Sequence, residues 1–222
     1  MRIGRLYRHL LSLGDGNPSI VMDDEAYFEM YSFQMPGNDH YYASAKGDGT
    51  YEQVFAPKAK FTNKILVWIA ISNQGISRPF CREWVHGAVT GEIYANDCLK
   101  KRLKPFIDMY HSNGHYLFWP DLASCHYSAV SRKAMDDLDI HYVDKEMNPP
   151  NCPQLRPIEN FWGLLKQEVY CNGWKANDLQ QLKRRIKYCL GKIDSNVVCG
   201  MMNDVKSKLR KARELGAEAM IK

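Results

Sequence analysis

The first part of the chain alternates short apolar runs with polar breaks, a pattern that is typical of buried strands. Residues 19–24 (SIVMDD) form an apolar run that ends in two acids. Residues 27–35 alternate loosely and either extend this strand or pair with it. Residues 36–62 are rich in Gly, Asp, Lys and Tyr and have no helical period, so we expect an irregular excursion there.

A second apolar run indicates a β-hairpin. Residues 64–72 (KILVWIAIS) are mainly β-branched and aromatic, the turn sequence NQG follows, and residues 76–84 can return as the partner strand. The apolar stretch Ile65 to Ile71 spans only seven residues, far fewer than the roughly 20 needed to cross a bilayer. We therefore expect a strand pair and no membrane segment.

The middle of the chain mixes helical and strand periods. Apolar residues recur at helical spacing over residues 91–110, and residues 128–138 indicate a second helix. Residues 115–120 (HYLFWP) are a short apolar run that delivers Asp121 at its end, and residues 140–143 predict one more strand.

Three prolines exclude a central strand or helix between Asp144 and Arg156, so this segment is predicted to be a loop. Pro157 suits the first turn of a helix, and an apolar stripe continues to about Tyr170.

Two further helices are predicted near residues 177–191 and 195–215, with Asn177 and Ser195 as their caps. Strands and helices therefore alternate along one chain, which indicates an α/β class in which helices flank one sheet. The length of 222 residues fits one large domain.

The amino-acid composition limits further which class of protein this chain can be. Hydrophobic residues make up 45% of the chain and charged residues 25%, which is ordinary globular usage. The start of the chain has no apolar stretch followed by a cleavage site, so it does not resemble a secretory signal and we expect an intracellular protein. Seven cysteines are scattered without a C-x-x-C pair, which favours reduced thiols over a disulfide framework or structural zinc. Cys125 and His126 offer half of a metal site, but no second pair follows at zinc-finger spacing.

Charge is unevenly distributed. From Lys183 onward the chain holds 11 Lys and Arg against 4 Asp and Glu, a net charge of +7, which leaves −2 for the rest. A basic end on a mildly acidic body favours contact with a polyanion, because Lys and Arg release counterions from phosphates. A solvated helix face explains the same charge, and both interpretations of Lys183, Arg184 and Arg185 stay open.

Three acids stand at the predicted element ends: Asp24, Asp121 and Glu159. Phosphodiester cleavage by two divalent ions needs carboxylates that converge on both metals, and Mg²⁺ prefers such oxygen ligands. Each acid alone has a structural explanation: a turn residue for Asp24, a cap for Asp121, and a favourable first-turn position for Glu159.

Together with their neighbours, these acids resemble the DDE transposases of the mariner-like superfamily. The matching blocks are MDDEAYF at 22–28, KILVWIAIS at 64–72, EIYANDCLKKRLKPFI at 92–107, FWPDLASCHYS at 118–128 and NPPNCPQLRPIENFWGLLK at 148–166. They follow the family's order over roughly residues 19–215. Because 37 residues separate Asp121 from Glu159, the chain resembles a longer-spaced branch. Leu122 and Arg156 replace two asparagines of the wider pattern, and Arg156 is a poor helix cap.

The resemblance implies an RNase H-like mixed sheet flanked by helices, with extra C-terminal helices. Residues 1–18 would be a partial N-terminal linker or helix, 19–172 the catalytic core, and 173–222 a basic helical extension of the same domain. Asp24, Asp121 and Glu159 would be both the catalytic residues and the ligands of two Mg²⁺ ions, with Mn²⁺ as substitute. Water would attack at the element's ends, and the freed 3′-hydroxyl would then attack target DNA.

The implied partners are double-stranded DNA and, in the full-length protein, a second copy in a homodimer. The implied location is the nucleus, and we expect no membrane and no small-molecule substrate. The family's helix-turn-helix modules have no counterpart in residues 1–17, so we expect a catalytic domain that does not select transposon ends alone.

Several residues near the acids keep two interpretations. His126 either touches DNA or packs a helix, Arg156 is a candidate DNA contact, and Trp162 is either core or a base-stacking platform. A truncated or domesticated derivative that binds DNA without cutting is the alternative function, and a general RNase H-like nuclease is a third. Retention of all three acids favours an active enzyme.

Overall fold

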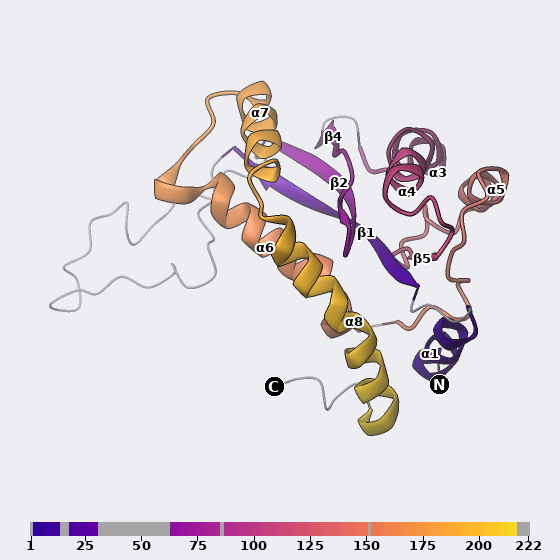
Figure 1. The fold of residues 1–222 in the computed structure, drawn as a ribbon. Helices are drawn as coiled ribbons and strands as arrows, with labels where there is room; N and C mark the ends of the chain where they lie inside the picture. The colour runs from indigo at the N-terminus through magenta and orange to yellow at the C-terminus, as the bar shows by residue number, and fades with distance from the viewer. Residues whose placement is uncertain (1, 14–17, 31–62, 85–86, 151, 217–222) are drawn as a thin grey trace, which may run out of the picture.

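The protein is built on one mixed sheet with helices on both faces (Figure 1). The computed structural model describes residues 2–13, 18–30, 63–84, 87–150 and 152–216. The expected excursion over 36–62 lies outside these residues. Within them, the predicted α/β class is confirmed.

The centre of the sheet is β1 (Ser19–Glu29), which extends beyond the predicted run. It pairs antiparallel with β2 (Lys64–Ser72) and parallel with β5 (Tyr116–Trp119), with Met22 opposite Trp119. Because β1 and β5 run in the same direction, the segment that leaves β5 emerges beside the acids of β1.

The continuous apolar sequence of β2 follows from its burial on both faces. Every residue after Lys64 is buried, and alternate side chains enter two separate cores: Ile65, Val67, Ile69 and Ile71 on one face, and Leu66, Trp68 and Ala70 on the other. A strand that is covered on both faces has no polar side to present, so its sequence is continuously hydrophobic.

The return strand predicted over 76–84 is wrong as a single element. It is split into β3 (Gly75–Ile76) and β4 (Phe80–Glu83), both paired with β2. Between them, the amide of Ala70 donates to the hydroxyl oxygen of Ser77 at 2.8 Å, so a side chain takes a position in the ladder. Pro79, which has no amide hydrogen, then prevents regular pairing.

One face of the sheet is covered by the predicted helix over 91–110, which is confirmed. Its ends are α-helical, α3 (Gly91–Ile93) and α4 (Lys104–Tyr110), and its middle, η2 (Tyr94–Leu103), is wound as a π-helix. Helix α5 (Ala129–Asp137), capped by Ser128, lies beside it. The strand predicted over 140–143 is wrong: only an isolated bridge joins Tyr142 to Phe118.

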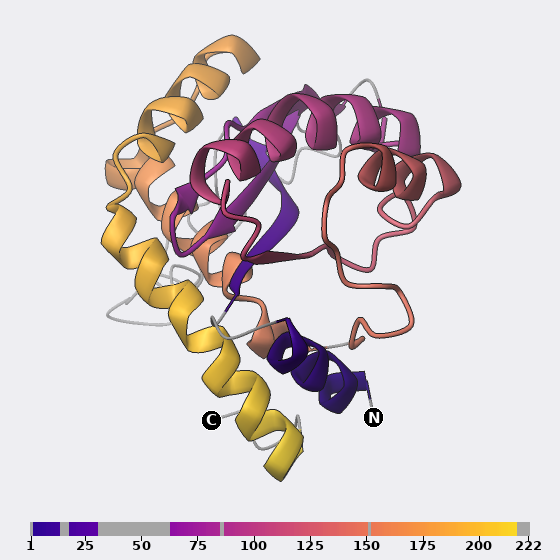
Figure 2. The ribbon, with the colours of Figure 1, turned by 45° about the vertical axis from the view of Figure 1, so that its right-hand side comes forward.

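The other face carries the C-terminal helices. Helix α6 (Pro157–Val169) follows the proline-rich loop and its short turn η3 (Pro153–Leu155). After the turn η4 (Cys171–Gly173) come α7 (Leu179–Leu190) and α8 (Ser195–Leu215). Helix α1 (Arg2–Ser12) packs against α8 through a buried stripe of Ile3, Leu6 and Leu10 (Figure 2).

Both predicted caps of these last helices are wrong by one residue: Asn177 is one residue too early and Ser195 is one residue too late. Asp178 caps α7 by accepting from the Gln181 amide at 2.6 Å, and Asp194 caps α8 by accepting from the Asn196 amide. A cap needs extended backbone ahead of the first helical residue, whereas Asn177 precedes that position and Ser195 already lies inside the helix.

None of the helices in the described ranges is long and apolar enough to cross a membrane.

Candidate active site

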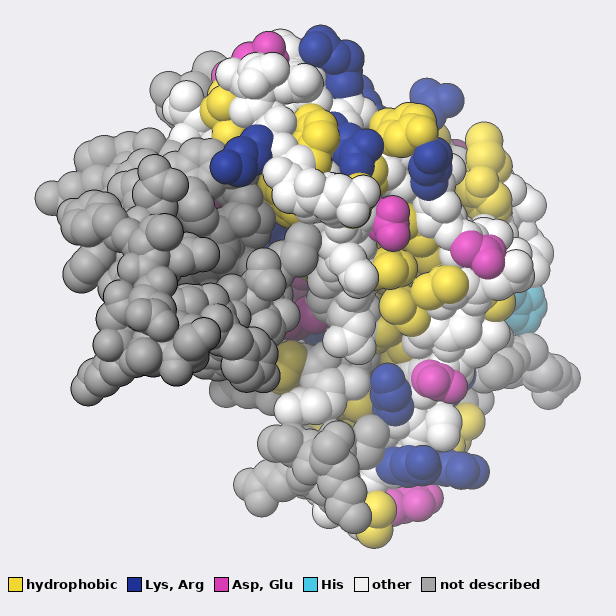
Figure 3. Space-filling view, turned by 90° about the vertical axis from the view of Figure 1, so that its left-hand side faces the viewer, with side chains coloured by type: hydrophobic (Ala, Val, Ile, Leu, Met, Phe, Trp, Pro, Cys, Tyr) yellow, Lys and Arg dark blue, Asp and Glu magenta, His cyan; other side chains and the backbone are white. Residues whose placement is uncertain are grey.

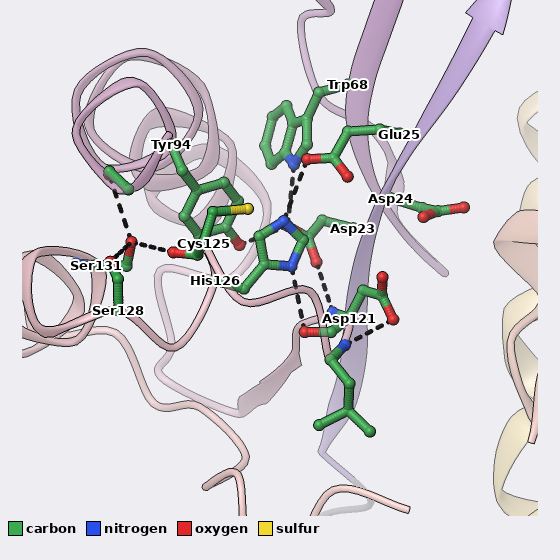
Figure 4. Close-up of polar contacts among 12 residues, drawn as sticks. Asp23, Asp24, Glu25, Trp68, Tyr94, Asp121, Cys125, His126, Ser128 and Ser131 are labelled. Carbon is green, nitrogen blue, oxygen red and sulfur yellow. Dashed lines mark hydrogen bonds and ion pairs between the residues drawn. The ribbon is translucent and has the colours of Figure 1, made fainter. Parts of the chain in front are cut away.

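Two carboxylates lie near each other where β5 ends beside β1. Strand β1 itself runs on past Asp24 to Glu29, so the prediction that Asp24 stands at a strand end is wrong. The last registered pair of these strands is Met22 and Trp119, after which β1 continues through Asp23 and Asp24 while β5 leads into Asp121. Successive side chains of a strand point to opposite faces, so Asp23 and Asp24 enter different environments. Figure 4 shows the carboxylates of Asp24 and Asp121 pointing away from Tyr94 and His126.

Asp23 is fully buried and structural. Its carboxylate accepts hydrogen bonds from the Trp68 indole at 2.9 Å and the Tyr94 hydroxyl at 2.5 Å. It also accepts from the backbone amide of Asp121 at 3.3 Å. Burial raises the pKa of Asp23, although His126 and Tyr94 oppose that rise. Asp23 thus fixes the backbone from which Asp121 projects.

Asp24 faces the helix α6. Its carboxylate accepts a hydrogen bond from the indole of Trp162 at 2.9 Å. Burial raises the pKa of Asp24 to about 7, against the lowering effects of Arg156 and Trp162, and the charge of Asp121 raises it further. The two aspartates therefore interact electrostatically, as expected of paired ligands.

Asp121 is half-buried, and one of its oxygens accepts from the amide of Leu122 at 2.6 Å (Figure 4). This is the local capping role that the sequence left open. A carboxylate has two oxygens with several acceptor positions, so the cap leaves acceptor capacity on Asp121 for another ligand.

Glu159 lies in the exposed first turn of α6, three residues before Trp162. Residues three apart are neighbours on a helix surface, so Glu159 stands one turn away from the indole that bonds to Asp24. The structure thus brings Asp24 and Asp121 together and places Glu159 on the helix that packs against Asp24.

Arg156 links β1 to the segment that follows β5. Its guanidinium donates to the backbone carbonyl oxygens of Asp23 at 2.6 Å and Pro120 at 3.4 Å. It makes no side-chain cap for α6, which confirms the prediction of a poor cap. These bonds give Arg156 a positioning role, and its contact with DNA stays a prediction.

The buried His126 pairs with the partly exposed Glu25 on the other side of β1. The His126 ring stacks on Tyr94 with centroids 4.1 Å apart, and its Nε2 lies 3.2 Å from a carboxylate oxygen of Glu25. Burial disfavours charge on the ring, but Asp23, Cys125 and Glu25 together raise the pKa of His126 well above its usual value. The structure supports the packing role of His126, and DNA contact stays a prediction.

Sequence reasoning missed Asp23, Glu25 and the buried Asn148. Asn148 accepts from the Trp119 indole and donates to the Pro120 carbonyl and the Tyr127 hydroxyl. One signal was available: Glu25 stands two residues from Asp23 and so shares its face of the strand. No local signal identifies Asn148, because its partners are distant in sequence.

The basic residues of α7 differ in what they contact. Arg184 is exposed and Lys183 half-buried, whereas Arg185 donates to the carbonyl oxygens of Glu168 and Val169 at the end of α6. Figure 3 shows Lys and Arg side chains gathered at the end of the molecule where α7 lies. Their contact with DNA stays a prediction, and Arg185 has a structural role besides.

No protein-family model matches the chain, and no curated protein matches its sequence. Solved structures do. The chain is similar to the Mos1 mariner paired-end complex with Mn, at a TM-score of 0.73 and 12% identity, over 98% of this chain and 61% of that one. It is also similar to the catalytic domain of Mos1 mariner transposase, at a TM-score of 0.64 and 13% identity, over 97% of this chain and 90% of that one.

The fold is RNase H-like. The mixed sheet flanked by helices is that of the Mos1 mariner catalytic domain, as the sequence resemblance predicted. The chain spans about 60% of the length of the transposase chains in the DNA complexes. At this level of identity the likeness establishes the architecture, and the chemistry must be argued from the side chains.

The carboxylates fit a divalent metal. Asp24 and Asp121 supply only oxygen donors, which suit Mg²⁺ or Mn²⁺. The pKa of about 7 at Asp24 reflects negative charge held where burial disfavours it, beside a second carboxylate. A cation at this position offsets that charge. The neighbouring Mos1 catalytic-domain structures were obtained with Mg and with Mn.

Proposed function

We propose that the chain is the catalytic domain of a mariner-like DNA transposase of the longer-spaced branch. The observation that carries the proposal is the proximity of Asp24 on β1 to Asp121, which follows the end of the neighbouring β5, against the helix that bears Glu159. This arrangement supplies three carboxylates from three elements of an RNase H-like fold.

The proposed reactions are hydrolysis at the element's ends and transfer of the freed 3′-hydroxyl into target DNA. Asp24, Asp121 and Glu159 would hold two Mg²⁺ ions, which activate the attacking oxygen and stabilise the leaving oxygen. The protein's own contribution is positioning: Trp162 orients Asp24, while Asp23 and Arg156 fix the backbone around Asp121. No side chain needs to act as nucleophile.

The partners follow from the same proposal. Double-stranded DNA is the substrate, the full-length protein works as a homodimer, and work on chromosomal DNA places it in the nucleus. Support for DNA as the partner comes from the Mos1 neighbours, which include a paired-end complex with a transposon end and a strand transfer complex.

A plasmid nicking assay tests the proposal. The chain should nick supercoiled DNA with Mn²⁺ or Mg²⁺ and lose activity in chelator, and Asp121→Asn should keep the fold but abolish nicking, because the amide removes a charge with little change of shape. DNA binding without nicking in either metal would instead support a derivative that no longer cuts. Full activity of Asp121→Asn would place the metal site elsewhere.

A further inference from the structure

Three metal-binding side chains of different chemistry meet on the side of β1 opposite to Asp24. They are Glu25 from β1 and Cys125 and His126 from the turn after β5 (Figure 4). One ligand atom from each, a carboxylate oxygen, a thiol sulfur and an imidazole nitrogen, lies within 4.8 Å of the other two. No sequence motif predicts this cluster, because Glu25 is 100 positions away from Cys125 in the chain.

The imidazole is already oriented for coordination. Its Nδ1 faces the backbone carbonyl oxygen of Asp121 at 3.2 Å, and because a carbonyl oxygen only accepts, Nδ1 carries the hydrogen. Its Nε2 then faces Glu25 at 3.2 Å. A histidine whose second nitrogen is held by a carbonyl is the usual arrangement at zinc sites, because the bond fixes the ring and makes the ligating nitrogen more basic.

The surroundings hold this geometry in place. The His126 side chain is 0% exposed and stacks on Tyr94, which itself donates to Asp23. Glu25 is 17% exposed and Cys125 is half-buried, so the cluster is open on one side. One ligand, His126, is thus buried and fixed by its contacts, and the other two, Glu25 and Cys125, keep some exposure to solvent.

We propose that Glu25, Cys125 and His126 form a binding site for Zn²⁺ or a similar borderline-soft divalent ion. A set of sulfur, nitrogen and oxygen ligands suits Zn²⁺, whereas Mg²⁺ avoids sulfur. Three protein ligands leave a fourth position for water. Glu25 and the thiolate balance the ion's two charges, and the protons displaced from Cys125 and from the His126–Glu25 bond go to solvent.

This site is separate from the carboxylate pair but connected to it. His126 holds the backbone carbonyl of Asp121 on one side of the strand end, and the Asp121 carboxylate projects on the other. A bound ion ties the turn at 121–126 to β1. It stabilises the second aspartate's position without taking part in hydrolysis.

Cobalt substitution and calorimetry test the proposal. Titration with Co²⁺ should give one equivalent with thiolate-to-metal absorption in the near ultraviolet, and calorimetry should give one Zn²⁺ per chain. Saturating Zn²⁺ should raise the melting temperature, because a ligand that binds only the folded state stabilises it.

Variants assign the ligands. Cys125→Ser and His126→Asn should each weaken Zn²⁺ binding by at least about tenfold and abolish the thiolate band or alter its position. The matched control is Cys199→Ser, another half-buried thiol, on α8, which should change neither. Asp121→Asn should also keep the cobalt spectrum, so the result does not depend on whether the proposed transposase activity is correct.

Two results would overturn the proposal: absence of the thiolate band in the wild-type chain, or Zn²⁺ binding by Cys125→Ser with unchanged affinity. The serine variant decides the matter even if His126→Asn fails to fold, because it keeps the His126–Glu25 pair. Its thermal unfolding without metal should match that of the wild type.

Discussion

Asp24 holds a carboxyl group between β1 and α6, where burial raises its pKa to about 7. The unfolded chain titrates Asp near 3.9. The folded protein therefore keeps a proton that the unfolded chain loses as the pH rises from about 4 to about 7, and stability falls through this window. Asp24 therefore costs stability at neutral pH in the metal-free protein, which agrees with its proposed role as a metal ligand.

Asp24→Asn should stabilise the metal-free protein. The amide oxygen still accepts from Trp162 but carries no charge, so the gain should be small at pH 4 and rise to a few kcal/mol by pH 8, at about 1.4 kcal/mol for each unit by which the pKa is raised. Chemical denaturation across this range measures it. A gain independent of pH would contradict the assignment, and added Mg²⁺ should reduce the difference by stabilising the wild type.

Glu159 should behave differently, because it is exposed. Glu159→Gln should change the free energy of unfolding by less than about 1 kcal/mol, the scale of a charge at a helix N-terminus. Metal-dependent nicking should nevertheless fall more than about a hundredfold, since a metal ligand contributes several kcal/mol to the transition state. Glu168→Gln, an exposed acid at the far end of α6, is the control and should nick normally.

Several helices and strands could be predicted from the local pattern of apolar residues, whereas their detailed ends and breaks could not. The helices over 91–110 and 157–169 follow from apolar spacing, and β2 follows from its continuous apolar run, because each pattern reflects burial of that element alone. The split of the return strand depends on Ser77 reaching Ala70, and the position of each cap depends on one backbone torsion. Such details are decided by contacts that periodicity does not contain.

The cap of α7 gives an element-scale prediction. Asp178→Ala should destabilise the protein by about 1 kcal/mol, because the amide of Gln181 loses its acceptor. Asn177→Ala should have a clearly smaller effect, although the sequence pointed to Asn177 as the cap. Thermal or urea unfolding of the two variants compares them directly, and the reverse order would restore the sequence-based assignment.

Across the whole molecule, the site could be predicted only in part from sequence. Asp24, Asp121 and Glu159 were proposed from family-like blocks and predicted element ends. The structure brings Asp24 and Asp121 near each other, and the catalytic role of all three acids stays a prediction. Asp23 and Glu25 were not, because their roles arise from Trp68, Tyr94 and His126, which approach from elements 43 or more positions away. The local sequence predicts roughly where a strand lies, but the packing of the whole sheet determines which side chains contact that strand.

DNA binding tests the molecule's charge distribution. Lys183→Gln with Arg184→Gln should weaken binding to all duplex sequences alike and reduce the log-log salt slope by up to about 0.9 for each lost phosphate contact. Filter binding at several salt concentrations measures both quantities. If the affinity and the salt slope were both unchanged, Lys183 and Arg184 would be solvated side chains that do not contact DNA.

Arg185 should be kept in that variant, because it bonds to the end of α6. Arg185→Gln alone should instead lower the free energy of unfolding by about 1 to 3 kcal/mol, the usual range for hydrogen bonds of a charged group. That result would separate the structural contribution of Arg185 from any contact that it makes with DNA phosphates.

The hydrogen bonds that assemble the acidic pair join distant parts of the chain. Asp23 meets the amide of Asp121 across 98 positions, Arg156 meets Asp23 across 133, and Trp162 meets Asp24 across 138. Such nonlocal contacts form late, since the intervening loop must close first. During synthesis, a ribosome that has not yet released α6 carries a chain without Glu159 and without the bond from Trp162 to Asp24. If the proposed function is correct, a partly translated chain should therefore be unable to cut DNA, and cutting should begin only after the fold has closed.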